Sequence, residues 1–223
     1  MNPPLVLSFD LDDTLWPVGP VIAAAESTLF AWLTERHPDA VSGHSIESLR
    51  ALRAAVAERH PAHGHDMTFL RHRALKDLFA AAGRTESLAD EALEVFMSAR
   101  NRVELYDDVL PSLERLRKRF PLFAVSNGNA DLRRCGLADL FAGHVTARAV
   151  GAAKPDARIY AALLKMAGVG AGEVLHVGDD PITDVLGASR AGMQAVWINR
   201  EAREWPGGLE RPPRTITTLA EIF

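Results

Sequence analysis

The chain has 223 residues, of which 48% are hydrophobic and 24% are charged, and its formal net charge at pH 7 is −4. These values are typical of a globular protein that forms one large domain or a core with a smaller second domain. The acidic balance argues against nucleic acid or an anionic membrane as the main partner. No apolar run approaches the ~18 residues that a membrane-spanning helix needs.

Cysteine usage bears on the compartment. Cys135 is the only cysteine, so an intrachain disulfide is impossible, which suits a reducing environment. The N-terminal residues lack the basic region and the long apolar segment of a secretion signal. We therefore expect a cytoplasmic protein, as a monomer or weak dimer, in which Cys135 is a passive residue rather than a nucleophile.

The stretch from Leu5 to Phe9 predicts a short apolar strand, and it runs directly into Asp10, Asp12 and Asp13. Three acids at one strand end repel one another unless a cation lies among them. Because side chains alternate along an extended segment, Asp10 and Asp12 are expected to point the same way. Two such carboxylates form a hard oxygen site suited to Mg²⁺. The alternative is a surface turn whose aspartates cap the next helix.

Residues 16 to about 102 show helical spacing and no strand pattern. Four helices are predicted, over residues 20–36, 45–59, 66 or 68 to 83, and 87–102. Ser45 is the expected N-cap of the second helix, and Ser48 three residues later leaves the capping box incomplete. The sequence thus divides into a first core segment at 1–15, an inserted helical domain at 16–102 and the rest of the core at 103–223.

Beyond residue 103 the pattern alternates. Helices are predicted at 108–119, 156–167 and 181–191, strands at 121–125, 144–148, 173–177 and 195–198, and a last helix or turn at 217–222. Strands that alternate with helices of this length predict an α/β fold, a three-layer Rossmann-like core with a mostly parallel sheet. Such sheets bind ligands at the carboxyl ends of their strands.

Three further polar motifs are expected at this edge. Ser126-Asn127-Gly128-Asn129 follows one strand, Lys154-Pro155 precedes a helix, and Gly178-Asp179-Asp180 with Asp184 follows another strand. Taken singly, they read as a turn, a surface lysine and a helix cap. Taken together, they supply acids from separate strands for a metal, and a lysine, a hydroxyl and backbone donors for a phosphate dianion.

The order Asp-Leu-Asp-Asp-Thr, Ser-Asn-Gly, Lys-Pro, Gly-Asp-Asp-x-x-x-Asp resembles the four motifs of the haloacid dehalogenase-like (HAD) phosphohydrolase superfamily. The resemblance covers nearly the whole chain, and the insertion resembles the helical C1 cap of that superfamily. More narrowly, the chain resembles a bacterial branch of flavin mononucleotide phosphatases, which is also linked to dephosphorylating the phosphoribitylaminouracil intermediate of riboflavin synthesis. The stretches that carry this likeness are 9–15, 126–130, 175–180 with 183–185, and 192–198.

The resemblance implies a role for each motif residue. Asp10 would attack phosphorus and become an aspartyl-phosphate. Asp12 would protonate the leaving alkoxide and then deprotonate the hydrolytic water. Ser126 and Asn127 would hold phosphoryl oxygens, and Lys154 would balance the charge of the nucleophile and the phosphate.

The implied cofactor is Mg²⁺, held by Asp10, the backbone carbonyl of Asp12 and Asp179. Asp184 would support the site through Lys154 or a metal-bound water. Asp180 is placed in the same supporting role, and which of Asp179 and Asp180 touches the ion stays open.

The implied function is hydrolysis of a small phosphorylated metabolite, such as FMN or a ribityl phosphate of riboflavin metabolism. A phosphosugar mutase and another phosphatase of the superfamily, for phosphoglycolate or a sugar phosphate, remain alternatives. A dehalogenase is disfavoured because its leaving group needs no acid at Asp12, and a phosphonatase because the insertion offers only Lys76. A receiver-type signalling domain and an inactive binding protein on the same fold are the non-enzymatic alternatives.

Substrate selection is expected in the helical insertion and at its junction with the core. Trp16, His65 and Phe69 are the candidates for contact with the leaving group, Trp16 by stacking on a flat ring. Hinge packing is the alternative for Trp16. The histidine-dense stretch from His60 to Asp66 is read as a solvated loop, with a transition-metal site as the less favoured alternative.

Overall fold

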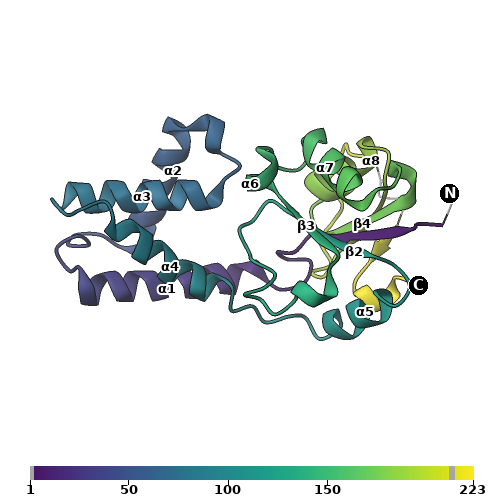
Figure 1. Cartoon of the computed structure of the whole chain (residues 1–223), viewed down its shortest axis with the longest axis horizontal. Helices are drawn as coiled ribbons and strands as arrows, with labels where there is room; N and C mark the ends of the chain where they lie inside the picture. The colour runs from purple at the N-terminus through teal and green to yellow at the C-terminus, as the bar shows by residue number, and fades with distance from the viewer. Residues whose placement is uncertain (1–2, 211–213) are drawn as a thin grey trace. The chain divides into compact units, whose positions relative to one another are not determined.

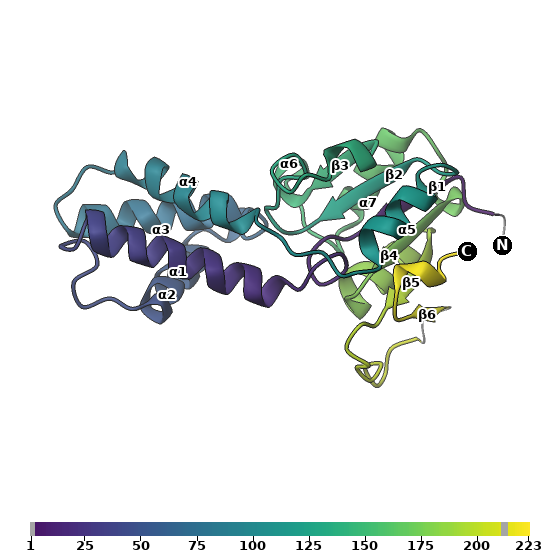
Figure 2. The ribbon, with the colours of Figure 1, turned by 90° about the horizontal axis from the view of Figure 1, so that it is seen from below.

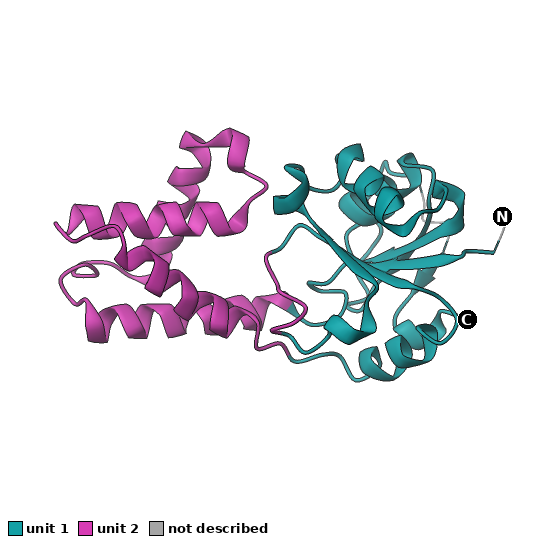
Figure 3. Cartoon of the chain, viewed as in Figure 1, with its two compact units in different colours: residues 1–17, 104–128, 135–223 teal, residues 18–103, 129–134 magenta. Residues whose placement is uncertain are grey.

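In a computed structural model, which describes residues 3–210 and 214–223, the chain forms two compact units (Figure 3). The described residues of the α/β unit lie within 1–17, 104–128 and 135–223, and the helical unit comprises 18–103 and 129–134. The sequence-based division keeps 129–134 in the core. These residues group with the helices because the Asp131 N–H donates to Asn101 and the Arg134 guanidinium pairs with Glu94.

The α/β unit is built on one six-stranded sheet with the order β3-β2-β1-β4-β5-β6, in which every pairing is parallel (Figures 1 and 2). Its strands are β1 (Val6–Phe9), β2 (Leu122–Ser126), β3 (Gly143–Thr146), β4 (Val174–Gly178), β5 (Gln194–Ile198) and β6 (Thr215–Ile216). The predicted α/β class with a parallel sheet and a helical insertion is confirmed, although β6 was not predicted. Phe9 pairs with Ala124 of β2 and Val177 of β4, so these three strands end at the same edge.

Helices cover both faces of this sheet (Figure 1). They are α5 (Val109–Leu116), α6 (Ala147–Val150), α7 (Ala157–Ala167) and α8 (Gly187–Arg190), with short 3-10 turns at 138–140, 171–173 and 219–221. On the α7 and α8 face, Ile159, Tyr160 and Leu163 pack with buried strand residues such as Val125 and Trp197. The predicted helix 181–191 is in fact a wider π-helical turn, Pro181–Leu186, that leads into α8.

The helical unit contains α1 (Val18–Arg36), α2 (Ile46–Arg59), α3 (Met67–Ala81) and α4 (Leu88–Arg100), with a 3-10 turn at Pro61–His63. Leu29 and Leu33 of α1, Phe79 of α3 and Phe96 of α4 meet in its main core. The prediction of an incomplete capping box at α2 was wrong. The Ser48 hydroxyl accepts the Ser45 N–H at 2.9 Å, while the Ser45 hydroxyl accepts the Ser48 N–H at 3.2 Å.

A buried carboxylate ties three helices of this unit together. Glu26 of α1 is 4% exposed and accepts bonds from Arg50 and Arg53 of α2 and from Arg71 of α3. The Arg71 guanidinium carbon also lies 3.5 Å from the centroid of the Phe96 ring. No helix in the described part of the chain is long and apolar enough to cross a membrane.

Candidate active site

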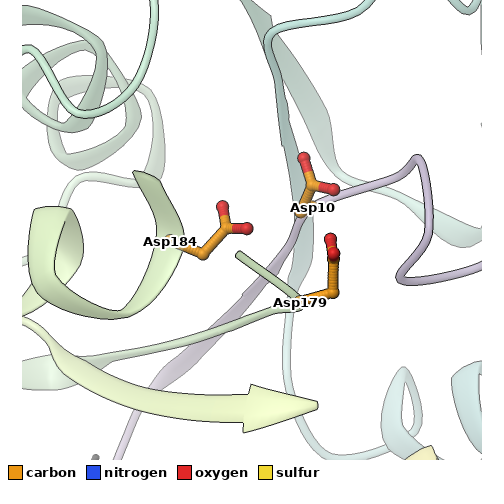
Figure 4. Close-up of side chains that lie close together, drawn as sticks. All are labelled: Asp10, Asp179 and Asp184. Atoms are coloured by element: carbon orange, nitrogen blue, oxygen red, sulfur yellow. The ribbon is translucent and has the colours of Figure 1, made fainter. Parts of the chain in front are cut away.

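Three carboxylates converge at the carboxyl edge of the sheet (Figure 4). Asp10 follows β1, Asp179 follows β4, and Asp184 lies in the π-helical turn. One oxygen of each lies within 4.8 Å of the others, and no second group of acids, histidines or cysteines within 3–210 and 214–223 is gathered this closely. Gly178 permits the approach of Asp184, because a Cβ at Gly178 would lie 2.5 Å from the Asp184 Cβ and Oδ2.

A buried lysine joins two of these acids. The Lys154 ammonium donates to Asp184 Oδ1 at 2.6 Å and also to Asp10 Oδ1. Asn127 holds the lysine backbone: its Nδ2 donates to the Lys154 carbonyl at 3.0 Å and its Oδ1 accepts the Lys154 N–H at 2.7 Å. The Asn127 side-chain amide therefore bonds to Lys154, whereas the family resemblance implied that Asn127 holds phosphoryl oxygens. As expected, Lys154 and Pro155 precede a helix, since Asp156 is the N-cap of α7.

Burial and neighbouring charges shift the pKa values of the ionisable groups at this site. Burial raises the pKa of Asp10 well above its usual range, although Lys154 opposes this rise. Burial also acts to raise the pKa of Asp184, but Lys154 and a bond from His176 outweigh it, so this pKa is lowered. The pKa of Asp179 is raised to about 6, by burial and then by the charge of Asp184. Burial acts to lower the pKa of Lys154, but Asp10 and Asp184 raise it.

A histidine supports this cluster from within the sheet, and sequence reasoning missed it. His176 of β4 is completely buried, its Nε2 lies 3.2 Å from Asp184 Oδ1, and its Nδ1 lies 2.9 Å from the Ser8 hydroxyl on β1. Burial lowers the pKa of His176, which favours the neutral ring. Two polar residues inside otherwise apolar strands were the available signal, since Ser8 and His176 are paired in register.

Asp12 lines the cavity at the sheet edge, whose volume is about 220 Å³, together with Asp10, Ser126 and Lys154. Its carboxylate is not one of the three that converge. Instead, Asp12 Oδ1 accepts the indole N–H of Trp16 at 2.8 Å. The Trp16 ring is 0% exposed, so the expected stacking face is not presented at the surface.

The remaining motif residues have local partners. The Ser126 hydroxyl accepts the Gly128 N–H at 2.9 Å, and both residues line the cavity. Asp180 caps the π-helical turn, because its Oδ1 accepts the N–H groups of Ile182 and Thr183 at 2.8 and 2.7 Å. The helix-cap alternative for this motif therefore describes Asp180. Asp184, expected to act through Lys154 or a metal-bound water, does accept a bond from Lys154 and also lies in the converging group.

An arginine from the C-terminal loop also reaches the site. The Arg203 Nη2 lies 3.0 Å from Asp179 Oδ2 and donates to the Asp179 carbonyl at 2.9 Å. Residues 211–213 of this loop lie outside the described residues. No local pattern marks Arg203, since its partner is 24 residues away.

In the helical unit, the candidate Phe69 is covered by histidines. The His63 ring stacks on Phe69 with centroids 4.0 Å apart, and His65 stacks on His63 at 6.5 Å. These histidines are not part of a close metal-ligating group among the described residues. The expectation that His65 and Phe69 contact a substrate stays a prediction.

A parallel α/β fold with carboxylates gathered at the carboxyl edge of its sheet is typical of an enzyme that binds its ligand at this edge. Residues 5–192 match the family model described as haloacid dehalogenase-like hydrolase, and the chain belongs to this family.

Several known proteins are similar over most of the chain. The 5-amino-6-(5-phospho-D-ribitylamino)uracil phosphatase YigB of Escherichia coli K12 is 38% identical over 87% of this chain and 83% of its own. A phosphoserine phosphatase of Thermus thermophilus is 36% identical over 69% and 64%. The crystal structure of a 2-haloacid dehalogenase from Pseudomonas syringae pv. Tomato has a TM-score of 0.92 and 38% identity, and the match covers 98% of this chain and 96% of that one. The expectation of an enzyme of the phosphatase type is confirmed by the family and its phosphatase members.

Proposed function

We propose that this hydrolase is a Mg²⁺-dependent phosphomonoesterase that forms an aspartyl-phosphate on Asp10. The observation that carries the proposal is the buried ion-pair arrangement at the sheet edge. There, Lys154 binds Asp10 and Asp184 while Asp179 adds a third acid. Such an arrangement can hold a nucleophilic carboxylate beside a cation and a phosphate dianion.

The acids fit a hard divalent cation. Three carboxylates share this space with Lys154, and Arg203 pairs with Asp179, so the acids outnumber these cations by one. Burial, together with the charge of the neighbouring acids, raises the pKa of both Asp10 and Asp179. Oxygen donors of this kind suit Mg²⁺. Asp10 and Asp179 would hold the ion, with Asp184 beside them and the Asp12 carbonyl as the ligand implied by family resemblance. Bound there, the ion would neutralise charge on the phosphoryl oxygens.

The protein's own groups account for the proton and bond changes. The Asp10 carboxylate forms a bond to phosphorus while the bond from phosphorus to the ester oxygen breaks, and Asp12 gives its proton to that oxygen. Asp12 then takes a proton from water as the water oxygen bonds to phosphorus, and the Asp10–phosphorus bond breaks. The Asn127 side chain holds the backbone of Lys154, and the Lys154 ammonium orients Asp10 and offsets negative charge throughout.

The loop after β2 provides the remaining phosphate contacts. Ser126 and Gly128 line the cavity together with Lys154. Because the Asn127 side chain holds Lys154, we assign its contribution to phosphate binding to the backbone N–H. Backbone donors at a strand end are suited to anions.

The likeness to a 2-haloacid dehalogenase supports a second candidate reaction. That reaction displaces a halide from carbon, and a halide leaves without a proton. Asp12 would then have no task, although it lines the cavity, and the acid cluster would need no divalent cation. Both features favour the phosphatase reaction over the dehalogenase reaction.

We propose ribityl phosphates as the substrate class, either FMN or the phosphoribitylaminouracil that YigB's name specifies. The helical unit would select among these esters, with His65 and Phe69 as contact candidates. Phosphoserine and phosphoglycolate are the competing substrates, because phosphatases of these two esters are among the relatives of this chain.

One experiment tests the reaction and the substrate together. Purified protein is incubated with 5-amino-6-(5-phospho-D-ribitylamino)uracil, FMN, phosphoserine, phosphoglycolate and a 2-haloacid, each with Mg²⁺ and with EDTA. We expect Mg²⁺-dependent release of inorganic phosphate, fastest from a ribityl phosphate, and no halide. Asp10→Asn controls for contaminating phosphatases. Halide release, or phosphate release that EDTA and Asp10→Asn leave intact, would refute the proposal, and an isomerised ester without phosphate would indicate a mutase.

A further inference from the structure

A fully buried indole holds the cavity-lining acid Asp12. The loop after β1 folds back on itself, because the Asp13 N–H donates to the Trp16 carbonyl and the Leu15 N–H donates to the Leu11 carbonyl, both at 2.8 Å. This fold brings the indole N–H of Trp16 to 2.8 Å from Asp12 Oδ1. Asp12 lines the cavity and Trp16 does not, so the indole contacts the Asp12 carboxylate from the protein interior and not from within the cavity.

This bond constrains Asp12 more than a flexible donor would. The Trp16 ring is 0% exposed and fixed by its packing, whereas Asp12 is partly exposed. A buried indole N–H is costly to leave without an acceptor, and the Asp12 carboxylate supplies one. The bond therefore limits rotation of the Asp12 carboxyl group. Because an indole N–H can only donate, it also leaves Oδ2 as the better oxygen to carry a transferable proton.

We propose that Trp16 is a positioning residue that holds Asp12 in the orientation from which it transfers its proton. The proposal rests on the phosphatase function proposed above. When the phosphorus–ester bond breaks, its electron pair goes to the ester oxygen, which takes the proton from Asp12 Oδ2. Trp16 neither gains nor loses a proton. In the hydrolytic step, the same bond keeps the ionised Asp12 aimed at the water.

The need for a well-placed acid depends on the leaving group. A primary alkoxide, as released from FMN, is strongly basic and must be protonated as it leaves, whereas p-nitrophenolate is stable as an anion. Loss of the indole N–H should therefore slow alkyl esters more than activated aryl esters. A purely structural role for Trp16 would affect all esters alike.

The test is Trp16→Phe, which keeps a buried aromatic ring and removes the N–H. We measure kcat/KM, which reports the steps up to departure of the leaving group, for FMN, phenyl phosphate and p-nitrophenyl phosphate. The expected loss is about 10-fold or more for FMN, part of the 10²–10⁴ that general acid catalysis supplies, and under about threefold for p-nitrophenyl phosphate. Phenyl phosphate should fall between them. The ratio of these losses does not depend on the fraction of active protein.

Trp32→Phe is the matched control, since it makes the same change at a half-buried tryptophan that packs on His37 in the helical unit. It should alter no ratio. A second measurement leaves Trp16 unchanged. The chain has four indole N–H groups, and the NMR resonance of the Trp16 indole N–H should shift in Asp12→Ala. Equal losses on all three esters, or an unmoved resonance, would overturn the proposal. A wild-type protein inactive on every ester would instead refute the phosphatase function, and this proposal with it.

Discussion

Gly178 is the position at which the packing of the site is most easily tested. Its substitution by Ala would put a Cβ 2.5 Å from Asp184 Cβ and Oδ2, about 1 Å closer than ordinary contact. Gly178 cannot shift freely, because it pairs with Trp197 of β5. Asp184 must therefore move by about 1 Å, which takes its Oδ1 from 2.6 Å to the limit of hydrogen bonding with Lys154.

The expected cost follows from two effects that overlap. Overpacking costs about 1–3 kcal/mol, and a weakened hydrogen bond between charged groups costs about 1.5–3 kcal/mol. Since both are relieved by the same movement, we expect Gly178→Ala to lower the free energy of unfolding by about 2–4 kcal/mol. Phosphatase activity should fall as well, because Lys154 loses one of its two carboxylate partners.

Urea unfolding followed by circular dichroism measures this change. Gly172→Ala is the matched control, because Gly172 lies in the turn just before β4 and a Cβ there would meet nothing within 4 Å. That variant should stay within about 0.5 kcal/mol of the wild type. If Gly178→Ala were as mild as Gly172→Ala, the argument that Asp184 depends on the missing Cβ would be wrong.

Three further outcomes are expected. Glu26→Gln should lower the free energy of unfolding by about 2 kcal/mol in urea titrations. This is less than the usual cost of breaking a buried ion pair, because the partners Arg50 and Arg53 are 47% and 30% exposed. A change under about 0.5 kcal/mol would contradict this. The pKa of Glu221 is lowered from 4.5 to about 2 by bonds from Thr217 and Thr218. The stability that ionised Glu221 gives the folded protein is therefore complete above pH 4.5 and lost toward pH 2. The Tm of Glu221→Gln should lie below that of the wild type at pH 7, and the difference should vanish near pH 2; a difference that stays constant with pH would contradict this. Mg²⁺ at about 100 times its Kd should stabilise the wild type by about 2.7 kcal/mol in thermal unfolding, and an equal gain in Asp179→Asn would exclude that residue as a ligand.

Local patterns were enough to predict most elements of the α/β unit. The apolar runs that end in Asp10, Ser126 and Gly178 mark β1, β2 and β4, because buried parallel strands read as continuous hydrophobic runs. The same reasoning placed the acids at one sheet edge. By contrast, β6 has only two residues and is defined by its pairing with β5, which leaves no periodicity to detect.

What the sequence could not supply are contacts set by tertiary packing. Arg203 reaches Asp179 from a loop without regular structure, and His176 reaches Asp184 from inside a strand. The bond between Trp16 and Asp12 spans only four residues, yet it depends on the loop folding back over itself. Residue types and spacing could not distinguish this loop from an exposed turn.

The membership of residues 129–134 in the helical unit affects how the enzyme can be recombined. The backbone passes between the two units four times, after residues 17, 103, 128 and 134, so the insertion is not a cassette attached at two points. A chimera that imports only 18–103 from a relative would set foreign side chains against Asp131 and Arg134, whose partners Asn101 and Glu94 would be gone. Exchanging the helical unit between family members therefore requires transplanting both segments together.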